Sequence, residues 1–178
     1  MTPPPADDDR SSPELTLRSV TGLSGIEPAA WDAVANPPGS EYDPFISWDF
    51  LEALEASGCV GEEAGWLPRH LIVEDASGRL RGALPLYLKT HSMGEYVFDH
   101  GWADAYERAG GQYFPKLLTA VPFSPVTGRR ILSGEAGIRR ALAAAAIQTV
   151  QQWGLSGWHV NFPAQAEWTE LAGYGLLQ

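Results

Sequence analysis

The chain has 178 residues, of which 44% are hydrophobic and 19% charged, an ordinary composition for one soluble globular domain. Twelve basic against twenty-two acidic residues give a net charge of −10, which argues against a protein that holds nucleic acid, tRNA included, mainly through its phosphates. No apolar run approaches the roughly eighteen residues that span a bilayer, and the lone cysteine, Cys59, cannot form an internal disulfide, so we expect a cytoplasmic protein.

Residues 1–13 are rich in proline and aspartate and have almost no apolar bulk, which predicts a disordered tail before a single domain over 14–178. The alternating pattern of LTLRSV predicts a strand over 15–20. Pro28 opens a short helix over 28–35, and Ser47 caps a second helix that Gly58 ends.

After Gly58 the spacing of the apolar residues changes to every second residue, which is typical of strands. Residues 70–75 and 79–88 flank Ala76-Ser77-Gly78 and predict an antiparallel hairpin. Further strands are expected over 116–123 and 158–162. The clearest helix, 135–153, is rich in alanine and is closed by Gly154, and a shorter helix over 166–175 follows the last strand.

Residues 84–123 hold eight of the nineteen aromatic residues and two of the four histidines, mixed with carboxylates and glycines. The stretch keeps neither the strand nor the helix period for long. Its composition therefore predicts an aromatic insertion, residues 90–115, that contacts a ligand or partner from the surface.

The order of elements is similar to the GNAT acyltransferase fold, an α/β (α+β) architecture in which a mixed central sheet is flanked by helices and a loop at the start of a long helix binds the cofactor. That fold needs a further strand pair after the helix at 166–175. Because an open sheet edge is costly, the similarity implies a truncated domain whose edge is completed by a second GNAT-like half, a swapped partner or a homo-oligomer.

The stretch from Pro85 to Leu132, PLYLKTHSMGEYVFDHGWADAYERAGGQYFPKLLTAVPFSPVTGRRIL, resembles the signature of a bacterial FemAB-like family of the GNAT superfamily, whose members are labelled as peptidoglycan biosynthesis or N-acetyltransferase proteins. The helix at 47–57 and GWLPRHL at 65–71 extend the resemblance to about residues 42–178. The resemblance implies that members of this family carry a second GNAT-like half.

The resemblance implies acyl transfer to an amine, with a small-molecule or peptidoglycan-precursor acceptor. FemAB relatives take an amino acid from aminoacyl-tRNA, whereas ordinary GNAT enzymes take the acyl group from acetyl-CoA or another acyl-CoA. Either donor needs an anion-binding loop, and Arg129, Arg130, Gly134, Ala136 and Gly137 at the head of the long helix resemble the GNAT pyrophosphate loop. The alternative is a strand-to-helix turn that needs small residues for close packing.

Acyl transfer also needs a base. If residues 91–99 are extended, His91, Glu95 and Asp99 share one face and converge, and neighbouring aromatic rings would raise the carboxylate pKa toward neutrality. Tyr96 and Tyr113 are candidates for donating a proton to the leaving group. The alternative is that these charged groups hold the insertion together.

Three cations, Lys89, Arg108 and Lys116, bracket the aromatic block. They either attract an anionic substrate or form salt bridges with Glu95 and its acidic neighbours. His91 and His100 have no third ligand at a metal-binding spacing, so no metal is expected.

Two functions of different class therefore remain: an acyltransferase, or a binding and assembly module without catalysis. The transferase hypothesis requires the insertion to lie beside the head of the 135–153 helix.

Overall fold

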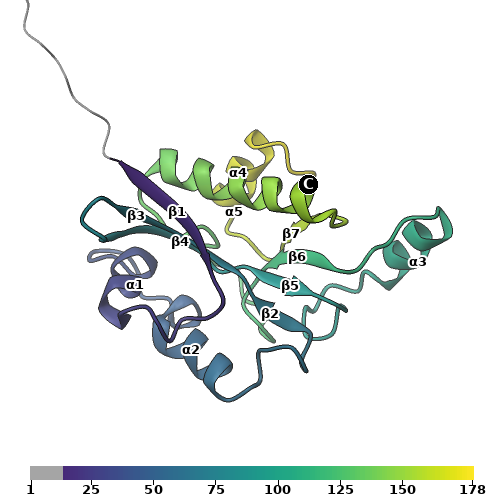
Figure 1. Ribbon diagram of the computed structural model, residues 1–178, viewed down its shortest axis with the longest axis horizontal. Helices are drawn as coiled ribbons and strands as arrows, with labels where there is room; N and C mark the ends of the chain where they lie inside the picture. Colours follow the sequence, from purple (N-terminus) through teal and green to yellow (C-terminus); the bar gives the residue numbers. More distant parts are fainter. Residues whose placement is uncertain (1–13) are drawn as a thin grey trace, which may run out of the picture.

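The computed structural model describes residues 14–178, and the tail predicted over 1–13 lies outside the described residues (Figure 1). The described part contains seven strands, five α-helices and one 3₁₀ turn. In chain order they are β1 (Leu15–Val20), α1 (Pro28–Ala35), η1 (Pro44–Ile46), α2 (Trp48–Ala56), β2 (Trp66–Pro68), β3 (His70–Asp75), β4 (Leu80–Leu84), β5 (Tyr87–Lys89), α3 (His100–Arg108), β6 (Lys116–Thr119), α4 (Ala136–Trp153), β7 (Trp158–Val160) and α5 (Gln165–Gly173).

The strands form two sheets, and this corrects the single strand predicted over 79–88. Strands β1, β3 and β4 make an antiparallel sheet, and β2, β5, β6 and β7 make a mixed one. Pro85 lies between β4 and β5, where it has no N–H to continue the ladder. The chain therefore leaves the first sheet at Leu84 and joins the second at Tyr87.

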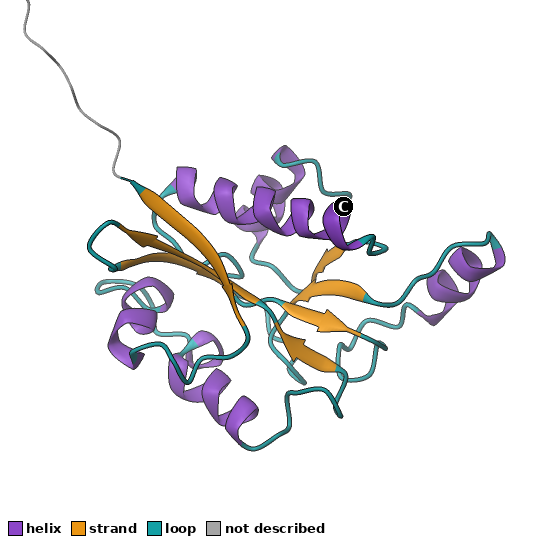
Figure 2. Cartoon of the chain, viewed as in Figure 1, coloured by secondary structure: helices purple, strands orange, loops and turns teal. Residues whose placement is uncertain are grey.

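The unit β6–α4–β7 is a parallel crossover, as the GNAT-like order predicts. Helix α4 buries Ile138, Leu142, Ala143 and Ala146 against the sheets. It ends where Gly154 adopts the left-handed conformation, with φ 64°. In Figure 2, α4 and α5 cover one side of the strands and α1 and α2 the other, which gives a three-layer α/β/α domain.

The opposite layer is fixed by Trp31 of α1 and Leu51 of α2, both buried in a second apolar cluster with Ile72 of β3. Ser47 caps α2 as predicted, because its Oγ accepts a hydrogen bond from Phe50 N at 3.3 Å. Strands β6 and β7 end earlier than expected, at Thr119 and Val160.

The aromatic insertion, residues 90–115, extends away from the body of the domain beyond the ends of β5 and β6 (Figure 1). We call it the arm. It contains a nine-residue helix, α3, that the sequence did not predict. Within residues 14–178, no helix has both the length and the hydrophobicity that crossing a bilayer demands.

Candidate functional site

Two lysines lie opposite each other where the arm joins the sheet. Lys89 of β5 pairs in register with Lys116 of β6, and both residues are fully buried. Lysine is almost never buried completely unless it is paired, so this pair identifies an unusual place in the fold.

Lys116 is held by two carboxylates from the arm. Its Nζ lies 2.9 Å from Glu95 Oε2 and 2.6 Å from Asp99 Oδ2. The hydroxyl of Tyr113 donates a second hydrogen bond to Asp99 Oδ2, at 2.8 Å. Three of the residues predicted to be catalytic, Glu95, Asp99 and Tyr113, are therefore brought together by one buried ammonium group.

The neighbouring lysine has a different environment. Lys89 Nζ donates to the carbonyl of Met93 at 3.2 Å and lies 3.9 Å from the ring centroid of Trp66. Among the described residues it forms no ion pair. Burial lowers the pKa of Lys89 to about 7, against the opposing attraction of Glu95, and the charge of Lys116 lowers it further.

The two carboxylates also differ in pKa. Burial raises the pKa of Glu95 above its ordinary value, although Lys116 and Lys89 act in the other direction. Burial would raise the pKa of Asp99 as well, but hydrogen bonds to that carboxylate, chiefly from Lys116, outweigh it and lower the pKa to about 2. Asp99 is therefore a weak base, and Glu95 is the more basic of the two.

The convergence of Glu95 and Asp99 is confirmed, but the extended segment expected to produce it is wrong. Gly94 and Tyr96 have φ values of 79° and 57°, which turn the chain between the two carboxylates. For Lys116, one of the three cations that bracket the aromatic block, the predicted salt bridge with Glu95 is confirmed. The cluster ties the loop before α3 to the sheet.

His91 and Tyr96 lie outside this cluster. His91 Nδ1 accepts a hydrogen bond from Met93 N at 3.2 Å, and Tyr96 is 54% exposed. Their catalytic roles stay predictions. No group of three or more His, Cys, Asp or Glu side chains within residues 14–178 has the arrangement to hold a metal ion.

The outer face of the arm is aromatic. Phe98 and Trp102 are 89% and 76% exposed, and Met93, Tyr96 and Tyr106 are exposed beside them. A hollow of about 310 Å³ opens in this face, lined by Ser92, Met93, Gly94, Tyr96, Val97, Phe98 and His100. Large exposed apolar side chains gathered on one projecting element are typical of a contact surface.

The predicted anion-binding loop lies at the other end of the domain. Arg130 is 2% exposed, and its guanidinium donates to the carbonyls of Asn161, Arg129 and Val126. Arg129 donates to the carbonyl of Ala35 in α1. The Arg130 guanidinium is thus buried and engaged by the protein itself, whereas Arg129 is half-buried and its role in donor binding stays a prediction.

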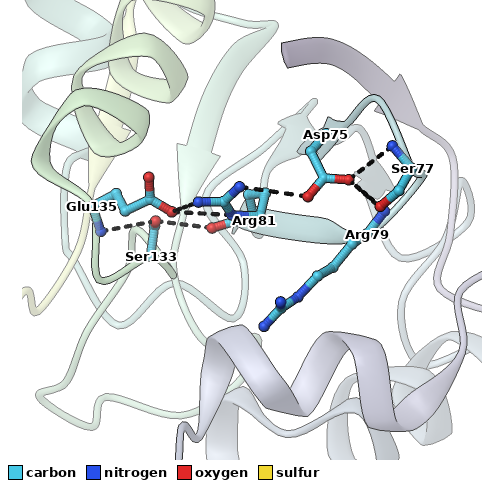
Figure 3. A network of polar contacts seen from close by, with 6 residues as sticks. All are labelled: Asp75, Ser77, Arg79, Arg81, Ser133 and Glu135. Atoms are coloured by element: carbon cyan, nitrogen blue, oxygen red, sulfur yellow. Dashed lines mark hydrogen bonds and ion pairs between the residues drawn. The ribbon is translucent and has the colours of Figure 1, made fainter. Parts of the chain in front are cut away.

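A polar network surrounds the head of α4 (Figure 3). Arg81 of β4 holds Glu135 at 2.6 Å and lies 3.4 Å from Asp75. Ser133 Oγ donates to the carbonyl of Arg81 at 2.9 Å and accepts from Glu135 N at 3.2 Å. The charge of Glu135, the residue that precedes α4, is therefore balanced by Arg81.

Close packing does not explain the glycines of this loop. A Cβ atom added to Gly134 or Gly137 would meet nothing within 4 Å, and neither has a positive φ. The alternative of a turn that needs small residues is thus not supported at these two positions. Open backbone at a helix N-terminus is what a phosphate-binding loop requires. The role of Gly134, Ala136 and Gly137 in donor binding stays a prediction.

The arm does not lie beside this loop, contrary to the expectation behind the transferase hypothesis. Figure 1 shows α3 beyond the C-terminal end of α4, whereas residues 129–137 precede its N-terminal end. Eighteen residues at 1.5 Å each make α4 about 27 Å long. One short cleft walled by both features is therefore excluded.

The sequence reasoning missed a buried polar group at the carboxyl end of β7. Asn161, directly after β7, is 8% exposed and its Nδ2 has no hydrogen-bond partner. Phe123 and Phe162 have φ values of 57° and 51°, which is strained for aromatic residues. Ligands of open α/β sheets bind at the carboxyl ends of parallel strands, so the predicted β6–α4–β7 order could have pointed here.

Comparison with known proteins agrees with this architecture. A family model described as FemAB-like, peptidoglycan biosynthesis/recognition, matches residues 22–178. No curated protein and no solved structure matches the chain. The matched range covers every helix of the domain and all strands after β1. The chain belongs to the FemAB-like family of peptidoglycan biosynthesis and recognition proteins.

Proposed function

We propose that the protein transfers an acyl group to an amine in peptidoglycan metabolism, with the donor at the head of α4 and the arm contacting a peptidoglycan-related acceptor. The requirement that the arm lies beside the donor loop is given up, because the two lie at opposite ends of α4. The arm then holds a part of the acceptor remote from the reacting amine, and that amine has to reach the donor at the head of α4. The observation that carries the proposal is the β6–α4–β7 crossover in a FemAB-like chain, with open backbone at Gly134 and Gly137. An acyl-CoA or an aminoacyl-tRNA would supply the acyl group.

In this reaction the amine nitrogen attacks the acyl carbonyl carbon, and the bond from that carbon to the donor sulfur or oxygen breaks. The attacking amine loses a proton to a base, and hydrogen-bond donors stabilise the oxyanion. Asn161 Nδ2 is a donor of this kind, because it is buried without a partner at the carboxyl end of β7. The N–H groups of the first turn of α4 would hold donor phosphates.

Glu95 and Asp99 were predicted as the base, and we now assign them first to positioning the arm. Both are bound by Lys116, and both belong to the arm, which lies at the end of α4 opposite the donor loop. The variants E95Q and D99N separate the two roles. A base variant loses turnover while acceptor affinity is kept, whereas a positioning variant weakens acceptor affinity first.

The test is a transfer assay with a lysine-containing muropeptide and either acetyl-CoA or aminoacyl-tRNA, read by the mass of the acceptor. A mass increase by one acyl group, lost in N161A, supports the proposal. An unchanged acceptor mass with both donors, while the muropeptide still binds, rejects transfer by this chain.

That second outcome would support a binding module instead. One observation favours it: two carboxylates of the arm, Glu95 and Asp99, are ion-paired with Lys116, whereas the aromatic side chains Phe98 and Trp102 are exposed. Such an arrangement is suited to recognition without chemistry. Loss of muropeptide binding in W102A, with no transfer in the parent protein, would identify this function.

A further inference from the structure

Strand β7 forms an open edge of the mixed sheet. Within residues 14–178 it pairs with β6 alone (Figure 1). Leu117 N donates to the carbonyl of Gly157 at 2.9 Å, and Asn161 N donates to the carbonyl of Thr119 at 3.0 Å, so residues 157 and 161 face β6. Because successive residues of a strand turn their backbone groups to opposite edges, the N–H and C=O groups of Trp158 and Val160 face away from β6. Such a row of edge groups is a template for a further strand.

A groove of about 720 Å³ borders β7, and the four consecutive residues 158–161 all line it. The side chains of Trp158 and Val160 pack on the apolar cluster under α4, whereas the ring of His159 lies 5.9 Å from that of Tyr113 on the other face of the sheet. A cavity on one face would be lined by every second residue of the strand. The groove therefore follows the backbone edge of β7.

The groove has no formal charge at pH 7. None of its fourteen lining residues is Asp, Glu, Lys or Arg, although these types make up 19% of the chain. Its histidine, His159, is neutral there because burial lowers the pKa of the imidazole to about 4. Trp158, Trp168 and Tyr174 supply aromatic rings. Few charges and many aromatic residues are typical of the core of a protein–protein interface and do not suit a phosphate or a carboxylate.

The two walls of the groove differ in polarity. Helices α4 and α5 supply apolar side chains on one side, namely Ile147, Val150, Trp168 and Leu171. His159 and Asn161, two residues apart along the strand direction, supply uncharged polar groups on the other. A strand that fits this groove therefore alternates apolar with uncharged polar side chains.

We propose that the β7 edge binds an extended peptide segment of another polypeptide, in which apolar and uncharged polar residues alternate. The segment adds one strand to the mixed sheet. Its backbone pairs with the outward N–H and C=O groups of Trp158 and Val160, and its apolar side chains lie against Ile147, Val150 and Leu171.

This inference does not rest on the proposed acyl transfer. The added strand is held by the backbone of β7 and by α4 and α5 side chains, and it uses neither the donor loop, the arm nor the Asn161 side-chain amide. It can be tested without any acyl donor, and the transfer assay can fail while this site stands.

The experiment is an NMR titration of the ¹⁵N-labelled chain with an uncharged hexapeptide in which threonine and valine alternate, blocked at both ends. We expect saturable shifts at the amides of residues 157–161 below about 2 mM peptide. Trp168 lines the groove and is 43% exposed, and we expect W168A to bind the peptide about fivefold more weakly. The matched control is W153A, which removes a ring that is 48% exposed outside the groove and should bind like the parent protein.

Two N-methylated peptides distinguish strand addition from apolar contact. One carries N-methyl groups on its valines and the other on its threonines, so each has one backbone edge blocked and the other intact. We expect one of the two to bind at least tenfold more weakly than the unmodified peptide and the other to bind like it.

Equal binding of the two methylated peptides, equal binding by W168A and W153A, or no shift at residues 157–161 would each overturn the proposal. Shifts at these amides that depend on protein concentration without any peptide would assign the edge to a second copy of the chain, which would overturn it as well.

Discussion

Replacing Lys116 with Met should destabilise the domain severely. The lysine side chain is completely buried, and its partners Glu95 and Asp99 have side-chain exposures of 0% and 11%. Methionine keeps the length of the side chain but leaves two carboxylates without their shared cation. Removal of one partner from a buried ion pair costs about 3–5 kcal/mol, and we expect K116M to lose this much unfolding free energy at pH 7.

Urea denaturation followed by circular dichroism measures this loss. The matched control is R18M, which breaks the Arg18–Glu74 ion pair, where the arginine side chain is 47% exposed, and should cost less than about 1 kcal/mol. Adding E95Q to K116M should recover part of the loss, because one unpaired charge is removed. A loss in K116M no larger than in R18M would refute the conclusion that this cluster anchors the arm.

Four further predictions concern the pH dependence of stability, the donor loop and the aromatic face. Folding lowers the pKa of Asp99 from 3.8 to about 2, so the stability that its carboxylate contributes is present above pH 4 and is lost as the pH falls toward 2. The unfolding free energy of D99N, measured over the same pH range, should not show this loss. Burial, with the charge of Lys116, lowers the pKa of His159 from 6.5 to about 4, so the unfolded chain binds the proton first. Stability should therefore fall as the pH falls from 6.5 to about 4, with a smaller slope in H159F; the same slope in H159F and the parent protein would contradict this. G137A should raise the unfolding free energy by about 0.4–1 kcal/mol, because its added Cβ meets no atom within 4 Å. The same variant should bind acetyl-CoA more weakly in calorimetry, whereas the control variant G173A in α5 should bind it like the parent protein. W102A, whose side chain is 76% exposed, should change stability by less than about 0.5 kcal/mol while reducing muropeptide affinity, and unchanged affinity would remove the aromatic face from recognition.

Most helices and strands could be predicted from local signals. Ser47 and Gly154 set the limits of α2 and α4, and the turn at Gly78, with φ 81°, connects β3 to β4. The break at Pro85 was missed because strand periodicity continues across it. Helix α3 was missed because Gly101 and nearby aromatic residues conceal a short helix that projects from the body and has only one buried residue, Ala103.

The site was predictable in composition but not in arrangement. The sequence identified Glu95, Asp99 and Lys116 as important. Their ion pairs, however, depend on the turn at Gly94 and Tyr96, which follows neither the helix period nor the strand period and so could not be predicted. The distance between the arm and the donor loop follows from the direction of β6, since the arm precedes its amino end and the loop follows its carboxyl end. Asn161 carried no sequence signal beyond its place after β7.

The separation of the two ends of the domain is tested most directly by one amide chemical-shift map recorded with acetyl-CoA and then with a lysine-containing muropeptide. We expect acetyl-CoA to shift residues 133–138 and Asn161 but no residue of the arm, and the muropeptide to shift residues 92–106. Shifts from both ligands in the arm, or no muropeptide shifts within it, would contradict a recognition arm set apart from the donor loop.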